Sequence, residues 1–319
     1  MRLKEAFHEG ELIGNSFKKF VLFVLIALLM LASEANQSLA SEMGKLAFVR
    51  DGNIWVGNTD GTDVRQLTSF NRQSGASSPS LSPDGKLVAF AHNRRICFMS
   101  TGGGQPKAMS SSTLTHADSV SFSPDGRYLV FRGHSECRKN KYDMDECLVS
   151  IWLAGLSDHS LKKVLSHRAA EEGMDIMPAP NMSPDGQLIV YTESDHEPTG
   201  GFRVINLQGQ EVFRYPPDPR DPKPYQFARF SPDGLKFICY SYDFSEAQRH
   251  EIYLVNMKDK SRRKITEGSA PIFVDGGAAI IFVRNQGLAG HRYQPDLYRM
   301  DLTPDAQPRK IIANADQPG

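Results

Sequence analysis

Histidine side chains are the residues of this 319-residue sequence best suited to chemistry, because imidazole binds metal ions and changes charge near neutral pH. Eight histidines follow residue 40, and His159 stands apart from the other seven. The seven lie in polar segments between predicted strands: His92, His116, His134, His167, His196, His250 and His291. If three or four of them meet in the folded protein, a metal ion or an anionic ligand becomes credible there. Their spacing along the chain does not show which ones meet.

No catalytic motif accompanies these histidines. The sequence lacks a Gly-x-Ser-x-Gly elbow, a His-Glu-x-x-His pair and a Gly-rich phosphate loop. Basic and acidic residues are equal at 37 each, and four of each lie in residues 1–40, so the remainder is neutral too. A neutral chain without a basic stripe does not predict nucleic-acid binding.

A repeated tetrapeptide, Ser-Pro-Asp-Gly, predicts the strands and turns that position the histidines. Its residue types suit a tight hairpin turn with a left-handed glycine. After each copy, large or apolar residues fall three and five places beyond the glycine, which is the period of a strand with that face buried. The four copies are Ser82-Pro83-Asp84-Gly85, Ser123-Pro124-Asp125-Gly126, Ser183-Pro184-Asp185-Gly186 and Ser231-Pro232-Asp233-Gly234.

Each unit reads as a four-stranded antiparallel meander. A degenerate copy at residues 273–276 and an incomplete one at the front bring the units to six. Such sheets must pack face to face, and closing them into a ring removes the exposed ends. We therefore predict an all-β fold with almost no helix, a six-bladed β-propeller with blades at about 44–69, 78–110, 118–166, 178–215, 225–267 and 269–314.

The repeat resembles that of a known family. Phe-Ser-Pro-Asp-Gly-x-x-Leu-x-Phe, followed by Ile-x-Val and Arg-x-Leu-Thr strands, is similar to the WD40-like (PD40) repeat of the TolB propeller family over about 44–314. The resemblance implies the blade; similar blades occur in binding scaffolds, peptidase-associated propellers and some sugar lyases. The chain departs from TolB because only about forty residues precede the propeller, where TolB carries an α/β domain.

Those leading residues read as an export signal. Lys18 and Lys19 precede an apolar run at 20–32, and small residues follow at Ser38 and Ala40. We predict a signal at 1–40 and a mature propeller at 41–319, periplasmic or secreted, with no stable membrane insertion after cleavage. The alternative is an uncleaved membrane anchor. The first unit lacks its innermost strand, and we favour residues 36–42 over the tail 315–319 to supply it, because Pro318 and Gly319 are poor strand residues.

The four cysteines divide by position. Cys97 and Cys239 fall inside predicted strands, where a cysteine is usually a small buried hydrophobe. Cys137 and Cys147 bracket a polar insertion at 138–146 in the third blade. An oxidising compartment predicts a disulfide between them, and the alternative is two free thiols in a loop.

Propeller geometry assigns the loops to two faces. The connections between second and third strands, and between blades, open on one face and hold nearly every insertion, so we expect recognition there. Asp118, Asp175 and Tyr225 stand just before innermost strands, near the central channel. With four of the histidines they complete the candidate ligand-binding set of Asp118, His134, Asp175, His196, Tyr225, His250 and His291. We expect replacing His134, His196 and His291 together, or Asp118 with Tyr225, to abolish binding and leave folding intact.

Two functions follow from this reading. The first is a monomeric, non-catalytic binding module of the cell envelope, without a cofactor, whose ligand is a protein, peptide or glycan. The second is an envelope hydrolase or lyase with a histidine-bound metal ion at the channel mouth. Metal analysis of the mature protein separates them.

Overall fold

The computed structural model describes residues 44–71, 74–109, 111–141, 143, 145–170, 179–193, 200–216, 224–242, 250–285 and 295–319. The chain divides into two compact units, residues 1–44 and 45–319, and the second contains all the described strands. The described residues hold one short 3-10 helix, Asp275–Gly277, and no α-helix. Within this part of the chain, no helix has the length and hydropathy needed to cross a membrane.

Twenty-three strands follow one another along the described part of the chain. The first eleven are β1 (Lys45–Arg50), β2 (Asn53–Asn58), β3 (Arg65–Gln66), β4 (Ser77–Leu81), β5 (Leu87–His92), β6 (Arg95–Ser100), β7 (Lys107–Ala108), β8 (His116–Phe122), β9 (Tyr128–Lys139), β10 (Asp145–Gly155) and β11 (Leu161–Ala170). The others are β12 (Asn181–Met182), β13 (Leu188–Glu193), β14 (Gly201–Asn206), β15 (Glu211–Tyr215), β16 (Tyr225–Phe230), β17 (Lys236–Tyr242), β18 (His250–Asn256), β19 (Arg262–Glu267), β20 (Ser269–Val274), β21 (Ala279–Asn285), β22 (Pro295–Asp301) and β23 (Arg309–Ile312).

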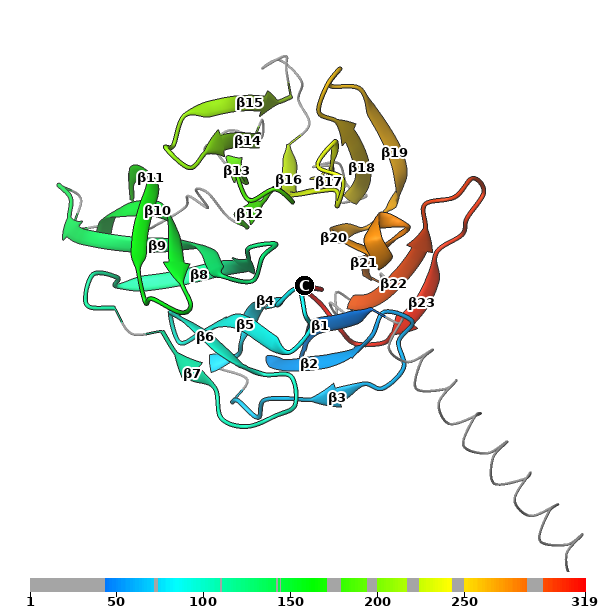
Figure 1. The fold of residues 1–319 in the computed structure, drawn as a ribbon, viewed down its shortest axis with the longest axis horizontal. Coiled ribbons are helices and arrows are strands. Elements are labelled where there is room, and N and C mark those ends of the chain that lie inside the picture. The colour runs from blue at the N-terminus through cyan, green and yellow to red at the C-terminus, as the bar shows by residue number, and fades with distance from the viewer. Residues whose placement is uncertain are drawn as a thin grey trace, which may run out of the picture. The chain divides into compact units, whose positions relative to one another are not determined.

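The strands form six antiparallel sheets, each paired in chain order. Figure 1 shows the six sheets around a common centre, with the C-terminus close to it. We number them as blades 1 to 6: β1–β3, β4–β7, β8–β11, β12–β15, β16–β19 and β20–β23. The six-bladed propeller predicted from the repeat is confirmed.

The core lies between the blades rather than inside any one of them. Six clusters of buried side chains occur, one at each junction of neighbouring blades, including the junction of blades 6 and 1. Val88 and Phe90 are fully buried as the repeat predicts, and so is Ala89 on the opposite face of the same strand. A blade with a neighbour on each side buries both sheet faces, as expected from sheets that pack face to face.

The tetrapeptide forms the predicted turn in all four copies. In the second copy the Ser123 hydroxyl donates to Asp125 Oδ1 at 2.6 Å and accepts from the Tyr128 N–H at 2.9 Å, while Gly126 has φ +69°. The same serine-to-aspartate hydrogen bond occurs in the other three copies. Serine, aspartate and glycine are therefore each required by the turn.

The C-terminal tail closes the ring. The N–H and C=O of Asp316 pair with those of Val49 at 2.8 Å each, and Gly319 pairs with Ala47 at 2.9 and 3.1 Å. The tail thus supplies the inner strand that blade 1 lacks, and our preference for residues 36–42 was wrong. Proline is tolerated because this strand lies at the channel edge of the sheet, where Pro318 needs no partner for a missing N–H.

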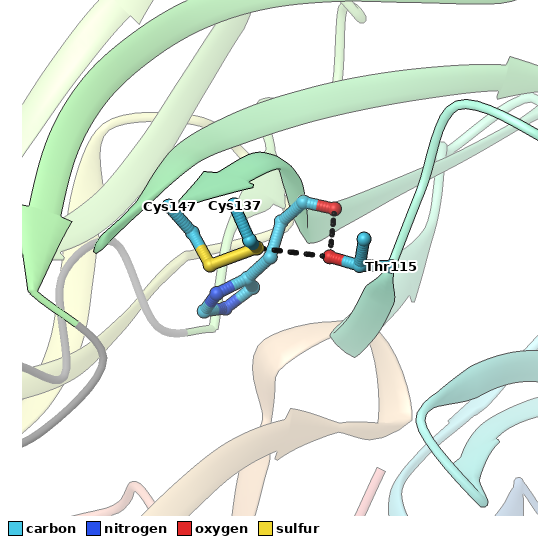
Figure 2. Close-up of a disulfide and its surroundings, with 4 residues drawn as sticks. Thr115, Cys137 and Cys147 are labelled. Atoms are coloured by element: carbon cyan, nitrogen blue, oxygen red, sulfur yellow. Dashed lines mark hydrogen bonds between the residues drawn. A yellow bond between two sulfur atoms is a disulfide. The ribbon is translucent and has the colours of Figure 1, made fainter. Parts of the chain in front are cut away.

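Blade 3 carries an extended hairpin where the sequence suggested a loop. β9 and β10 stay paired out to Lys139 and Asp145, so His134 lies in a strand rather than in a loop. Cys137 and Cys147 are joined by the predicted disulfide near the end of this hairpin, with the Thr115 hydroxyl 3.2 Å from the Cys137 sulfur (Figure 2). Cys97 and Cys239 are buried free thiols, also as predicted.

Replacing Cys137 and Cys147 by alanine is expected to lower the free energy of unfolding by about 2 kcal/mol, because the bond closes a short loop in the unfolded chain. Strand pairing already holds the two residues together in the folded state. Urea unfolding of the oxidised protein, the reduced protein and the double variant measures the effect. The double variant should not respond to reductant, and a response would mean that another pair of cysteines is linked.

Candidate functional site at the channel mouth

A cavity of about 400 Å³ occupies the mouth of the central channel. Every blade contributes to its wall, blade 1 through the C-terminal tail. The lining residues are Ser77, Ser78, Pro79, Asp118, Ser119, Val120, Arg132, Ala179, Pro180, Phe227, Arg229, Tyr240, His250, Ser269, Ala270, Asp316, Gln317 and Pro318. The volume falls in the range of sites for small ligands or single side chains.

The channel wall is built from one bulge repeated six times. In each blade, a non-glycine residue at the start of the inner strand adopts a left-handed backbone conformation: Ser78, Ser119, Ala179, Phe227, Ala270 and Gln317, with φ between 47 and 52°. The strand register shifts at these positions in blades 2, 3, 5 and 6. Such a conformation costs about 1–2 kcal/mol for an L-residue, so the surrounding fold must hold it. The sequence gives one sign of it, a proline after four of the six residues.

Asp118 is held by an ion pair inside this wall. Arg132 donates to both carboxylate oxygens of Asp118 at 2.6 and 2.8 Å, and His116 Nε2 lies 3.1 Å from Oδ2. The side chains of Asp118 and Arg132 are only 17 and 11% exposed. Burial raises the pKa of Asp118, but the hydrogen bonds and charges of His116 and Arg132 outweigh it and hold the pKa well below its usual range. Asp118 is therefore an ionised, already paired group.

His134 lies behind this pair. Its ring is nearly parallel to that of His116, with 4.7 Å between ring centres, because the two residues face each other across β8 and β9. His134 is 9% exposed, and neither ring nitrogen has a hydrogen-bond partner. Burial, together with the charge of His116, lowers the pKa of His134 to about 4. The imidazole is therefore neutral at physiological pH.

His116, Asp118 and His134 form the one group of metal-ligating side chains found among the described residues, with ligand atoms within 4.8 Å of one another. Two imidazoles and a carboxylate suit a transition metal. The Arg132 guanidinium, however, already occupies both oxygens of Asp118 and brings a positive charge to the same place. The group as it stands does not fit a divalent metal ion.

The depressed pKa of His134 predicts an acid sensitivity. Its folded pKa of about 4 lies below the ordinary 6.5, so the unfolded chain takes up a proton first as the pH falls. Stability should fall between pH 6.5 and 4 by about 3 kcal/mol in total. Urea unfolding at pH 7, 5.5 and 4.5 measures this.

His134→Phe is the matched variant, because it keeps an aromatic ring against His116. Most of the acid sensitivity should disappear in it; a smaller part belongs to His250, whose pKa burial also lowers. An unchanged pH dependence in His134→Phe would contradict the assignment to His134.

The blade 5 side of the cavity carries an aromatic wall. Phe227 and Tyr240 stack with 5.7 Å between ring centres, and His250 lies 5.4 Å from Tyr240. The Tyr240 hydroxyl donates to Gln226 at 3.1 Å. Arg229 lines the cavity beside this wall, and its side chain forms no hydrogen bond or ion pair with a described residue.

The candidate residues predicted from sequence have different positions in the structure. Asp118 and His250 line the cavity, and His134 lies behind it. Tyr225 is fully buried in the core between blades 4 and 5 and does not line the cavity, so that prediction was wrong. Asp175, His196 and His291 lie outside the described residues. Sequence reasoning missed Arg132, Arg229 and Tyr240, which lie inside strands.

A second cavity, of about 460 Å³, lies on the opposite face, between blades 5 and 6. It is lined by the Ser231 turn, Arg262 and Gly277, among others. Arg262 there bonds to the buried Tyr225 hydroxyl and lies over the Tyr253 ring. This cation supports the packing of blade 5, so the channel mouth remains the better candidate site.

These features define the class of the protein, a six-bladed β-propeller with a lined central channel. Neither a protein-family model nor a curated protein matches the chain. Its propeller is similar to TolB from Acinetobacter baumannii, at 16% identity and a TM-score of 0.65, covering 86% of this chain and 66% of that one. It is similar to a putative TolB from Agrobacterium tumefaciens at 16% identity and 0.60, covering 85 and 89%. An oligogalacturonate lyase in complex with manganese matches at 13% and 0.54, covering 82 and 70%. At these identities the similarity concerns the fold.

Proposed function

We propose that this protein is a non-catalytic binding module of the cell envelope, periplasmic or secreted, which binds a protein, peptide or glycan at the channel mouth. The observation that carries the proposal is the 400 Å³ cavity to which all six blades contribute. The acid and base best placed for proton transfer, Asp118 and His116, are committed to an ion-pair network with Arg132. The similarity to TolB propellers is in keeping with binding. Intact mass of protein from the envelope tests the location, with the mature chain starting near Ser41 rather than retaining an anchor.

Site-specific photo-crosslinking tests the recognition face. A benzophenone amino acid at Ser119 places the probe in the bulge ring, where Phe227 shows that an aromatic side chain fits the same backbone position. The control is the same residue at His159, an exposed position that also has a left-handed backbone. We expect adducts in envelope extracts from position 119 and none from 159. Adducts from position 159 alone would contradict the proposal.

A metal-dependent hydrolase or lyase is the second candidate. The observation that favours it is the His116, Asp118 and His134 group, together with the similarity to a lyase in complex with manganese. Arg132 counts against a metal-dependent enzyme, because its guanidinium must leave Asp118 before a metal ion can bind there. Elemental analysis of the purified protein for manganese and zinc decides: a stoichiometric metal lost in His116→Ala supports the enzyme, and its absence leaves the binding module.

A further inference from the structure

Arg229 is the one arginine in the channel wall that lacks a counter-ion among the described residues. The other, Arg132, is neutralised by Asp118. Arg229 lies on β16 opposite Ile238 and projects into the cavity lining. The residue is partly buried. Burial lowers the pKa of Arg229 to about 10, and no nearby carboxylate raises it. Asp316, the other carboxylate of the lining, therefore does not compensate it.

An uncompensated guanidinium inside a protein is unfavourable for folding. Removing an arginine from water costs free energy that is normally recovered through a carboxylate partner or several hydrogen bonds. Arg132 has such partners, and the Arg229 side chain has none among the described residues. A buried charge that destabilises the fold is expected where the residue serves binding rather than folding.

The surroundings of Arg229 restrict the chemistry of its ligand. A guanidinium pairs best with a planar oxyanion that accepts two parallel hydrogen bonds, as a carboxylate does. The cavity lining also offers apolar side chains, among them Pro79, Val120, Pro180, Phe227, Ala270 and Pro318. Two polar lining side chains are already used, because the Tyr240 hydroxyl donates to Gln226 and Gln317 Oε1 accepts from the Ser78 N–H. A carboxylate with apolar groups on either side matches the guanidinium and these apolar side chains.

We propose that Arg229 anchors a carboxylate of a peptide segment that enters the channel mouth, with the apolar flanks of that segment against Phe227 and the channel prolines. This inference rests on the proposed binding function and names the chemistry of its ligand. The cavity volume limits the inserted part to a short segment of the partner. Arg229 is then the residue that determines specificity for an acidic ligand.

Calorimetric titration with defined peptides tests the proposal. The probes are acetyl-Leu-Glu-Leu-amide and its neutral counterpart acetyl-Leu-Gln-Leu-amide, added to the full chain and to Arg229→Met and Arg229→Lys. We expect the Glu peptide to bind the unmodified protein about tenfold or more tightly than the Gln peptide. Arg229→Met should remove this preference, and Arg229→Lys should keep part of it. Equal binding of the two peptides, binding of neither, or an unchanged preference in Arg229→Met overturns the proposal.

The melting temperature of Arg229→Met distinguishes a binding role of Arg229 from a structural one. Because the Arg229 side chain has no partner to lose in the described part of the chain, Arg229→Met should melt at the same temperature as the unmodified protein or higher. A lower melting temperature in that variant would show that Arg229 supports the fold and would overturn the proposal. Digalacturonate is the third probe: binding of the sugar that depends on Arg229, without binding of the Glu peptide, overturns the choice of a peptide.

The two proposals fail in different ways. The crosslinking experiment at Ser119 is repeated in the Arg229→Met background. Adducts that persist there overturn the role of Arg229 and leave the binding module standing. Loss of the adducts in Arg229→Met alone supports the anchor. Absence of adducts in the unmodified protein contradicts the binding function itself, and with it the inference.

Discussion

Deleting residues 315–319 is expected to lower the melting temperature of the propeller by roughly 10 °C. The deletion removes four backbone hydrogen bonds to β1 and one from Ala315 to Pro295, each worth about 1 kcal/mol net. It also removes Ala315, a fully buried member of the cluster between blades 6 and 1. A ring that is open at one junction exposes the inner edge of β1 and the facing side of blade 6. Differential scanning calorimetry measures the change.

The control for this deletion is the double variant Asp316→Ala, Gln317→Ala. It keeps the backbone pairing of the tail with Val49 and Ala47. It loses the bond from the Ser78 N–H to Gln317 Oε1 and the bond from the Gln317 N–H to Asp316 Oδ1. We expect a fall of only a few degrees, because the backbone hydrogen bonds that hold the tail on β1 remain. A deletion that leaves the melting temperature unchanged would assign ring closure to another segment.

Replacing Tyr225 by alanine is expected to lower the free energy of unfolding by about 3–5 kcal/mol, the usual cost of removing a buried aromatic side chain. Tyr225 is fully buried. Its ring packs edge-on against Tyr215 and Tyr253, with 5.0 and 5.9 Å between ring centres, and its hydroxyl bonds to Arg262. The change therefore opens a cavity between blades 4 and 5. Urea unfolding of the purified variant gives the value.

Tyr225→Phe separates the ring from the hydroxyl. It keeps both aromatic contacts and should cost only about 1 kcal/mol, for the lost hydrogen bond to Arg262. Both variants should bind ligand normally under conditions where they are folded. A Tyr225→Ala protein with unchanged stability and lost binding would return Tyr225 to the ligand site and contradict its place in the core.

The prediction from sequence that Asp118 and Tyr225 act together in recognition fails for a structural reason. The two residues occupy similar places at the start of inner strands, but Asp118 lines the cavity and Tyr225 faces the neighbouring blade. Replacing both was expected to leave folding intact. The structure indicates that it would instead remove a core aromatic ring and leave Arg132 without its carboxylate, which is destabilising on both counts.

Local chemistry in the sequence determined the blade, because each unit is specified by neighbouring residues. The Ser-Pro-Asp-Gly turn uses hydrogen bonds within six residues, and the period-two pattern after it follows from strand geometry alone. Six such units imply a ring, and the short spacing of Cys137 and Cys147 allowed their disulfide to be predicted. These features need no knowledge of distant contacts.

Tertiary structure decided which residues meet at the channel, because one bulge in each inner strand shifts the register. On one side of the bulge in β8, Phe122 pairs with Leu129 and Ser121 with Val130. Regular pairing would then place Asp118 opposite Gly133, but the bulge places it opposite Arg132. In β16, simple alternation would place Tyr225 and Arg229 on the same side of the strand. The bulge instead places Tyr225 on the same side as Ala228 and Phe230, and Arg229 in the channel wall. A single left-handed residue reverses the facing of everything beyond it, and in β8 and β16 no proline follows that residue to mark it in the sequence. Ring closure by the tail is likewise a contact between the two ends of the propeller, which only the assembled fold brings together.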